Sequence, residues 1–239
     1  MSKRFEELDW SRTPIGEISL RRRHEPVLDV EVFEARLDED FLMSSLFTVA
    51  EIALADLGLA QVPGSDLDVV VGGLGLGYTA QAVLADRRVR SLTVVEALPE
   101  VIGWHERGLL PVAADLTTDT RCQLAAGDFF DLVRTGGPFG PAAPDRVHAI
   151  LVDIDHTPRH VLHPSHADLY TPAGLQRLTG RLLPGGVFAL WSDDPPDPDF
   201  AEALGQVFAS AAAHVVSFAN ALTGGQSTNT VYVAVTPPV

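Results

Sequence analysis

The sequence predicts an α/β fold in which a mostly parallel central sheet follows a small N-terminal region of hairpin and helix. From Asp66 onward, short apolar runs alternate with segments of helical spacing, the order that strand–helix–strand units produce. These runs are nearly continuous in apolar residues, which is typical of strands buried on both faces. Residues 1–62 differ, because residues 28–37 alternate apolar and polar side chains as a half-buried strand does.

The N-terminal region is expected to span residues 1–62. Residues 18–22 and 28–37 are predicted to pair as an antiparallel hairpin. Residues 45–59 have helical apolar spacing and favourable helix formers, so a helix is expected there. The Pro-Gly-Ser segment at 63–65 breaks the chain, and residues 63–239 are expected to form the second domain.

The second domain is predicted to alternate strands with helices. Strands are expected at 67–71, 92–95, 123–126, 149–152, 187–191, 214–218 and 230–235. Helices are expected at 78–85, from about 99, and at 129–132, 175–183 and 200–213, with a glycine-rich polar turn at 223–229. This order predicts a Rossmann-like sheet with right-handed crossovers and helices on both faces. In such sheets a ligand binds beyond the carboxyl ends of the strands, so the loops there are the candidate site.

Composition limits the functions that the chain can have. The formal net charge is −15 and the sequence pI is near 4.7, which disfavours nucleic acids and anionic membranes as partners. The single cysteine, Cys122, excludes an intramolecular disulfide. Residues 1–7 are polar, and no apolar run approaches the roughly 20 residues that span a bilayer. We therefore expect a cytoplasmic protein that binds a small molecule, with a cationic amine as one candidate.

The first candidate loop is the glycine-rich segment GGLGLG at residues 72–77. Gly73, Gly75 and Gly77 permit a sharp turn and let a ligand approach the backbone without a Cβ in the way. The helix expected from Tyr78 directs its N–H groups at that ligand. A tight strand–helix turn without a ligand is the alternative.

Two acidic residues follow the next two strands. Glu96 lies where a carboxylate accepts hydrogen bonds from the hydroxyls of an adenosine ribose, and Asp128 where one meets the adenine amino group. The alternative for each is a helix cap. A glycine loop, a ribose acid and an adenine acid in this order resemble the class I methyltransferase fold. A nicotinamide-dependent dehydrogenase is the alternative, but a hairpin precedes the glycine loop and no second nucleotide-binding half follows.

The loop after the strand at 149–152 holds the candidate catalytic residues. Asp153, Asp155 and His156 follow the buried strand directly, and such a cluster can bind a substrate amine and remove its proton. The alternative is a solvated acidic turn that caps a helix. Asp193 and Asp194 follow the strand at 187–191 and are candidates for binding a cationic substrate, with a rigid solvated loop as their alternative.

A metal site is not expected, although four histidines lie between residues 156 and 166. Their spacing of three to four would suit one face of a helix, but Pro158 and Pro164 interrupt any regular helix there. We expect surface or substrate-facing histidines instead.

The segments VVVGGLGLG, SLTVVEALPEVI, LAAGDFFD and AILVDIDHTP occur in the order found in the polyamine aminopropyltransferases, and the chain resembles this spermidine synthase-like family over most of its length. The resemblance implies that the glycines line the cofactor tail and that Glu96 holds the ribose. It further implies that Asp128 and Phe129 contact the adenine and that Asp153 deprotonates the attacking amine. Tyr170 lies in a segment that resembles the one after the family's catalytic loop, and is a candidate substrate contact. The family also implies a homodimer.

Two departures from the family keep the transferred group open. The glycine loop has Leu76 where the family has an aspartate that holds the aminopropyl ammonium of decarboxylated S-adenosylmethionine, and His156 stands where the family has a second catalytic aspartate. The first hypothesis is aminopropyl transfer to an amine, with Asp153 as the base. The second is methyl transfer from intact S-adenosylmethionine, whose carboxylate Leu76 would tolerate. A non-catalytic nucleoside-binding scaffold is the third, and the combination of Glu96, Asp128 and Asp153 argues against it.

Overall fold

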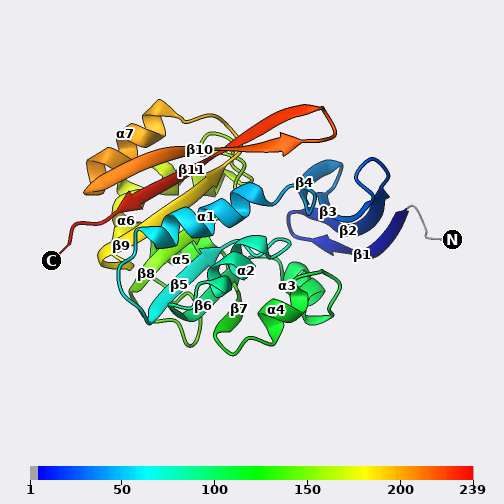
Figure 1. The fold of residues 1–239 in the computed structure, drawn as a ribbon. Coiled ribbons are helices and arrows are strands. Elements are labelled where there is room, and N and C mark those ends of the chain that lie inside the picture. The colour runs from blue at the N-terminus through cyan, green and yellow to red at the C-terminus, as the bar shows by residue number, and fades with distance from the viewer. Residues whose placement is uncertain (1–4, 239) are drawn as a thin grey trace.

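The computed structural model of the chain describes residues 5–238 and contains two sheets (Figure 1). The smaller sheet is antiparallel, in the order β1-β2-β3-β4, and lies at the N-terminal side of the molecule. Its strands are β1 (Phe5–Thr13), β2 (Gly16–Glu25), β3 (Val30–Leu37) and β4 (Asp40–Ser44). The predicted hairpin is the centre of this sheet. The flanking strands β1 and β4 were not predicted, because neither has a long regular apolar alternation.

The larger sheet has seven strands in the order β10-β11-β9-β8-β5-β6-β7. Strands β9, β8, β5, β6 and β7 are parallel, and β11 runs antiparallel to both β9 and β10. The strands are β5 (Leu67–Gly72), β6 (Val89–Glu96), β7 (Cys122–Ala126), β8 (Val147–Val152), β9 (Leu182–Ser192), β10 (Ser210–Asn220) and β11 (Gly225–Val235). This arrangement confirms the predicted α/β fold with a mostly parallel central sheet. Strand order reverses between β5 and β8, so ligands are expected beyond these two strands.

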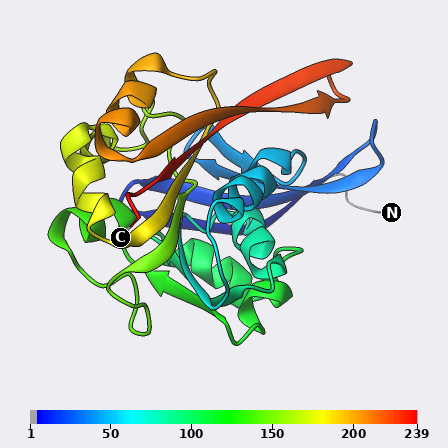
Figure 2. The same ribbon diagram turned by 60° about the vertical axis from the view of Figure 1, so that its left-hand side comes forward.

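Helices cover both faces of the larger sheet (Figures 1 and 2). They are α1 (Val49–Ala60), α2 (Tyr78–Ala85), α3 (Pro99–Glu106), α4 (Ala113–Thr117), α5 (Phe129–Thr135), the 3-10 helix η1 (Pro164–Tyr170), α6 (Pro172–Thr179) and α7 (Pro198–Val207). None of the helices within residues 5–238 has the length and apolarity needed to cross a membrane.

Alternate residues of the central strands enter two separate hydrophobic clusters. In β9, Val187 and Ala189 pack with the side of α1 to α4, whereas Phe188 and Leu190 pack with the side of α5 to α7. All four side chains are almost completely buried. The nearly continuous apolar runs of the sequence therefore reflect a sheet that is covered on both faces.

Two predicted helices end earlier than expected. The helix expected at 175–183 corresponds to α6, which ends at Thr179 because β9 begins at Leu182. Residues 200–213 were predicted as helix, but α7 ends at Val207 and β10 begins at Ser210, so this part of the prediction is wrong. The run of small residues at 210–213 suits a helix by intrinsic propensity. Pairing with β11, from Ser210 opposite Val235 onward, overrides that preference. The turn predicted at 223–229 is likewise shorter, because β11 already begins at Gly225.

Two further segments pack around the larger sheet. The β10–β11 hairpin extends past the other strands toward β4 (Figure 1). There Phe218 of β10 packs against Phe47, with ring centroids 5.5 Å apart. Helix α1 packs across β8, β9 and β11, although it was placed in the N-terminal region at 1–62 from the sequence. The division at residue 62 remains a prediction.

Asp9 of β1 connects the small sheet to α3 through contacts with two side chains. Its Oδ2 accepts a hydrogen bond from Trp104 Nε1 at 2.8 Å and pairs with Arg107 at 2.5 Å. Burial by itself raises the pKa of Asp9, but the hydrogen bonds from Arg107 and Trp104 outweigh it and leave the pKa below the ordinary aspartate value. Trp104 is fully buried, so the small sheet is anchored to the core of the larger unit.

We expect Asp9→Asn to lower the free energy of unfolding at pH 7 by about 1 kcal/mol, since it removes a partly exposed ion pair. A depressed carboxyl pKa stabilises the fold above the ordinary pKa, and this stabilisation is lost as the pH falls through the native value. The difference between the two proteins in chemical denaturation should therefore shrink below about pH 4. Glu7→Gln is the control, because Glu7 lies on the same strand and faces Arg21 at 3.9 Å while half-exposed. An equal loss in both variants would contradict the anchor.

Candidate active site

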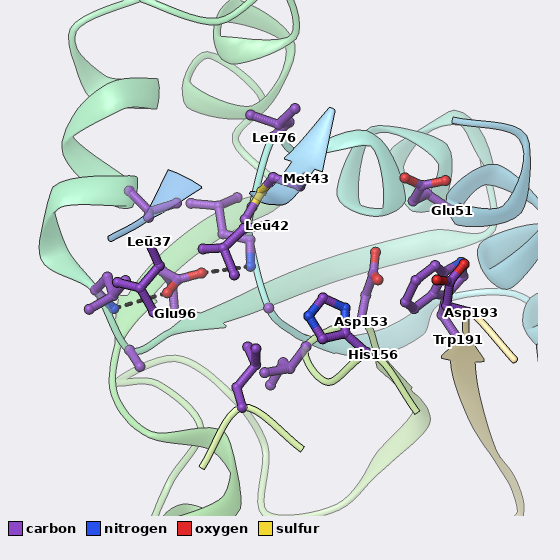
Figure 3. Close-up of a pocket in the computed structure, with 18 of the residues that line it drawn as sticks. Leu37, Leu42, Met43, Glu51, Leu76, Glu96, Asp153, His156, Trp191 and Asp193 are labelled. Carbon is purple, nitrogen blue, oxygen red and sulfur yellow. Dashed lines mark hydrogen bonds between the residues drawn. The ribbon is translucent and has the colours of Figure 1, made fainter. Parts of the chain in front are cut away.

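A cavity of about 1130 Å³ lies beyond the carboxyl ends of the parallel strands. The loops after β5, β6, β7, β8 and β9 form its floor, while β3, β4 and the β10–β11 hairpin supply lining residues from the other side. Figure 3 shows Leu37, Leu42 and Met43 of the small sheet on the same side of the view as Leu76 of the glycine loop. The cavity is thus closed by segments distant in sequence from the parallel strands.

The glycine loop approaches its neighbours too closely for any side chain. Gly73 has φ +94°, and a Cβ there would lie 2.2 Å from the Asp153 carbonyl oxygen. Gly77 caps the start of α2 with φ 93°, and a Cβ there would lie 2.7 Å from His105 Cε1. His105 Nε2 lies 2.9 Å from the Gly75 carbonyl oxygen, so α3 holds the loop from below. Burial lowers the pKa of His105, which favours a neutral imidazole in this contact.

Glu96 ends β6 at the edge of the cavity. Its two carboxylate oxygens accept hydrogen bonds from the backbone N–H groups of Leu74, at 3.0 Å, and Leu98, at 2.9 Å (Figure 3). Burial raises the pKa of Glu96, and these backbone hydrogen bonds act in the opposite direction. Each oxygen can accept a further hydrogen bond, so Glu96 can serve a ligand while it braces the glycine loop.

Asp128 has the capping role that was its alternative from the sequence. Its Oδ1 accepts hydrogen bonds from the N–H groups of Phe130, at 2.9 Å, and Asp131, at 3.2 Å, at the start of α5. The side chain also lines the cavity and is exposed. Phe129 is buried beneath Gly72, where its ring would lie 2.8 Å from an added Cβ. An adenine contact by either residue remains a prediction.

Asp153 lies at the centre of the site. Its backbone N–H donates to the Gly72 carbonyl at 2.9 Å, which joins the catalytic loop to the glycine loop. Its Oδ2 accepts a hydrogen bond from Thr79 Oγ1 at 2.7 Å, and the residue lines the cavity. Burial raises the pKa of Asp153, and the Thr79 hydrogen bond opposes this. A carboxylate with a raised pKa, open to a cavity, suits a general base.

Asp155 and Tyr170 lie outside the lining of the cavity. Asp155 is 1% exposed and accepts hydrogen bonds from Tyr170 Oη and the Leu162 N–H, both at 2.7 Å. His166 Nδ1 lies 2.9 Å from the same carboxylate. The three partners fix the loop that follows Asp153. The catalytic role expected of Asp155 and the substrate contact expected of Tyr170 remain predictions, and both residues lie outside the lining of the cavity.

His156 and Asp193 follow β8 and β9 and both line the cavity, and a role for either in catalysis or substrate binding remains a prediction. The Asp193 N–H donates to the His156 carbonyl at 2.8 Å, and Asp193 Oδ1 accepts from Asn229 Nδ2 at 2.7 Å. Asp194 is exposed and does not line the cavity. Within residues 5–238, no group of three or more His, Cys, Asp or Glu side chains is placed to hold a metal ion.

Glu51 is a site residue that the sequence did not reveal. It lies on α1, lines the cavity and faces the region of Asp153 (Figure 3). Burial raises the pKa of Glu51 to about 8, and the charge of Asp153 adds to the shift. A glutamate in the first turn of a helix is common and carries no signal by itself. Only the packing of α1 across the larger sheet brings Glu51 to the site.

The cavity is strongly acidic. Among the described residues, its lining includes five carboxylates and no lysine or arginine. The carboxylates are those of Glu51, Glu96, Asp128, Asp153 and Asp193. Such a lining favours cationic ligands and disfavours anionic ones.

Solved structures share this fold. The spermidine synthase from Thermotoga maritima superposes with a TM-score of 0.72 at 18% identity, covering 96% of this chain and 72% of that chain. A spermidine synthase in complex with the transition state analogue AdoDATO gives a TM-score of 0.73 at 17% identity, covering 96% and 73%. Human methyltransferase-like protein 13 in complex with SAH gives 0.55 at 20% identity, covering 80% and 81%.

These likenesses confirm the predicted class I methyltransferase fold, which the chain shares with these spermidine synthases and with the methyltransferase-like protein. No protein-family model and no curated protein matches the sequence. At these identities the likeness establishes the fold, and the chemistry has to be argued from the cavity.

We expect Gly73→Ala to lower the free energy of unfolding by about 3 kcal/mol, because the added Cβ would overlap the Asp153 carbonyl at an unfavourable φ. Gly64→Ala is the matched control: Gly64 also has a positive φ, +85°, but nothing lies within 4 Å of an added Cβ. That variant should lose only about 1 kcal/mol from backbone strain. Equal losses in thermal unfolding would show that the contact between the two loops does not constrain Gly73.

Proposed function

We propose that the chain is a transferase that binds an adenosyl-sulfonium nucleoside and alkylates an amine acceptor. The observation that carries the proposal is the placement of Glu96 and Asp153 in one cavity at the carboxyl edge of the sheet. Glu96 retains acceptor capacity for ribose hydroxyls, and Asp153 is a carboxylate of raised pKa in the same space. Two of the solved structures that share the fold are complexes with AdoDATO or SAH, which supports a ligand of this kind here.

The residues of the chain divide the work between binding and proton transfer. The glycine loop and Glu96 would hold the nucleoside, and Asp128 would contact its adenine. When bound, the sulfonium supplies an electrophilic carbon and a neutral thioether leaving group. Asp153 would accept a proton from the acceptor's ammonium group, which frees the nitrogen lone pair for attack on that carbon. Thr79 fixes the orientation of the Asp153 carboxylate through the bond to Oδ2.

The acidic lining favours aminopropyl transfer as the specific reaction. Decarboxylated S-adenosylmethionine keeps the ammonium group of the intact cofactor but lacks its carboxylate. It is therefore the more cationic of the two and suits a cavity lined by five carboxylates without lysine or arginine among the described residues. Methyl transfer from intact S-adenosylmethionine is the second candidate. It is supported by Leu76, a buried apolar side chain that is 5% exposed and lines the cavity. The polyamine aminopropyltransferases carry an aspartate at the position of Leu76.

Calorimetric titration with methylthioadenosine, decarboxylated S-adenosylmethionine and S-adenosylmethionine tests the proposal. We expect all three to bind, the decarboxylated form about tenfold or more tightly than the intact one, the size of one charge-assisted hydrogen bond. Tighter binding of intact S-adenosylmethionine would instead support methyl transfer as the reaction. Binding of none of the three would refute the nucleoside site itself.

A further inference from the structure

Asp153 is one of two carboxylates that border the same part of the cavity. Asp153 reaches it from the loop after β8 and Glu51 from α1, and Trp191 and Asp193 lie beside them (Figure 3). These four residues come from three separate segments of the chain. The small sheet contributes none of them, so this part of the cavity is distinct from the ribose end at Glu96.

Within the described part of the chain, no basic side chain pairs with either carboxylate. Asp153 accepts one hydrogen bond, from Thr79, and Glu51 accepts none from another side chain within residues 5–238. Like charges that share a buried space cannot both ionise without cost. The arrangement would be relieved by a cation that enters between them.

The residues around the two carboxylates indicate which chemical class of cation would bind there. Trp191 contributes an aromatic ring to the lining, and the packed rings of Phe47 and Phe218 add apolar surface to the same cavity. Besides Asp153, Tyr78 interacts with Glu51, and Asp193 and His156 are further titratable groups in the lining of the cavity. An alkylammonium group suits both the carboxylates and the aromatic lining, because it offers hydrogen-bond donors to the carboxylates and an apolar chain to the aromatic rings.

We propose that Glu51 is the second carboxylate of the acceptor site, and that Glu51 and Asp153 together bind one alkylammonium group. This inference rests on the proposed function and adds a specificity-determining residue to it. It assigns to α1 a direct part in selecting an amine over a neutral or anionic acceptor. The bound ammonium would then lie next to the base that removes its proton.

The pair makes amine binding depend on pH in a defined direction. Burial and the neighbouring Asp153 raise the pKa of Glu51 to about 8, so near neutrality the pair holds a proton in the absence of ligand. Entry of an alkylammonium favours the charged form of both carboxylates, and binding should release that proton to the solvent. Affinity should therefore rise between about pH 6.5 and pH 9, below the pKa of the amine itself.

The test is calorimetric titration of n-butylamine into the chain saturated with methylthioadenosine. Titrations in two buffers of different ionisation enthalpy measure the protons released. We expect Glu51→Gln to weaken butylamine binding at pH 8.5 by about 10- to 100-fold and to abolish both the proton release and the rise with pH. Asp153→Asn should weaken binding similarly. Asp56→Asn is the control, because Asp56 is an exposed carboxylate on the same helix.

Several results would overturn the inference. These are unchanged butylamine affinity in Glu51→Gln, absence of butylamine binding to the wild-type complex, or equal binding of butyrate. Loss of the pH dependence in His156→Gln rather than in Glu51→Gln would assign the proton to the histidine. Failure of methylthioadenosine to bind in the first step would refute the proposed function instead. The two failures are thus distinguishable.

Discussion

The site depends on the close contact between the glycine loop after β5 and the loop after β8. Gly72 accepts a hydrogen bond from the Asp153 N–H, and Gly73 donates one to Val95, so three adjacent strands are linked where they end. The backbones approach so closely that a Cβ on Gly73 would lie 2.2 Å from the Asp153 carbonyl. This contact fixes the glycine loop and the candidate base relative to each other. Further elements then complete the cavity: α3 holds the glycine loop through His105, and Asp155 holds the loop beyond Asp153.

Withdrawal from water is the second constraint on the site. Burial raises the pKa values of Glu51, Glu96 and Asp153, and the three carboxylates differ in the hydrogen-bond donors that oppose this shift. Glu96 receives backbone N–H donors, Asp153 receives the Thr79 hydroxyl, and Glu51 has neither a basic partner nor a side-chain donor within the described chain. The cavity therefore stores unfavourable electrostatic energy that a cationic ligand would relieve. This explains why an acidic cavity suits a sulfonium nucleoside and an amine in one site.

Much of the scaffold was predictable because its signals are local. Continuous apolar runs predicted the buried strands, and the glycine loop and Glu96 occupy the predicted strand ends. The positions of Asp153 and Asp155 show where local signals fail. Both follow β8 two residues apart, yet one lines the cavity and the other turns away to bind Tyr170, and the sequence does not reveal which. Glu51 escaped prediction because its role depends on how α1 packs over the larger sheet, a long-range contact that helical spacing does not specify.

The central claim is that the carboxyl edge of β5, β6 and β8 binds an adenosyl nucleoside with Glu96 at its ribose. The most direct test is a crystal structure of the chain with methylthioadenosine. The account predicts ribose hydroxyls at hydrogen-bonding distance, about 2.5–3.2 Å, from the Glu96 carboxylate, and the sulfur on the side of Asp153. A nucleoside bound elsewhere, or bound in this cavity without contact to Glu96, would contradict it.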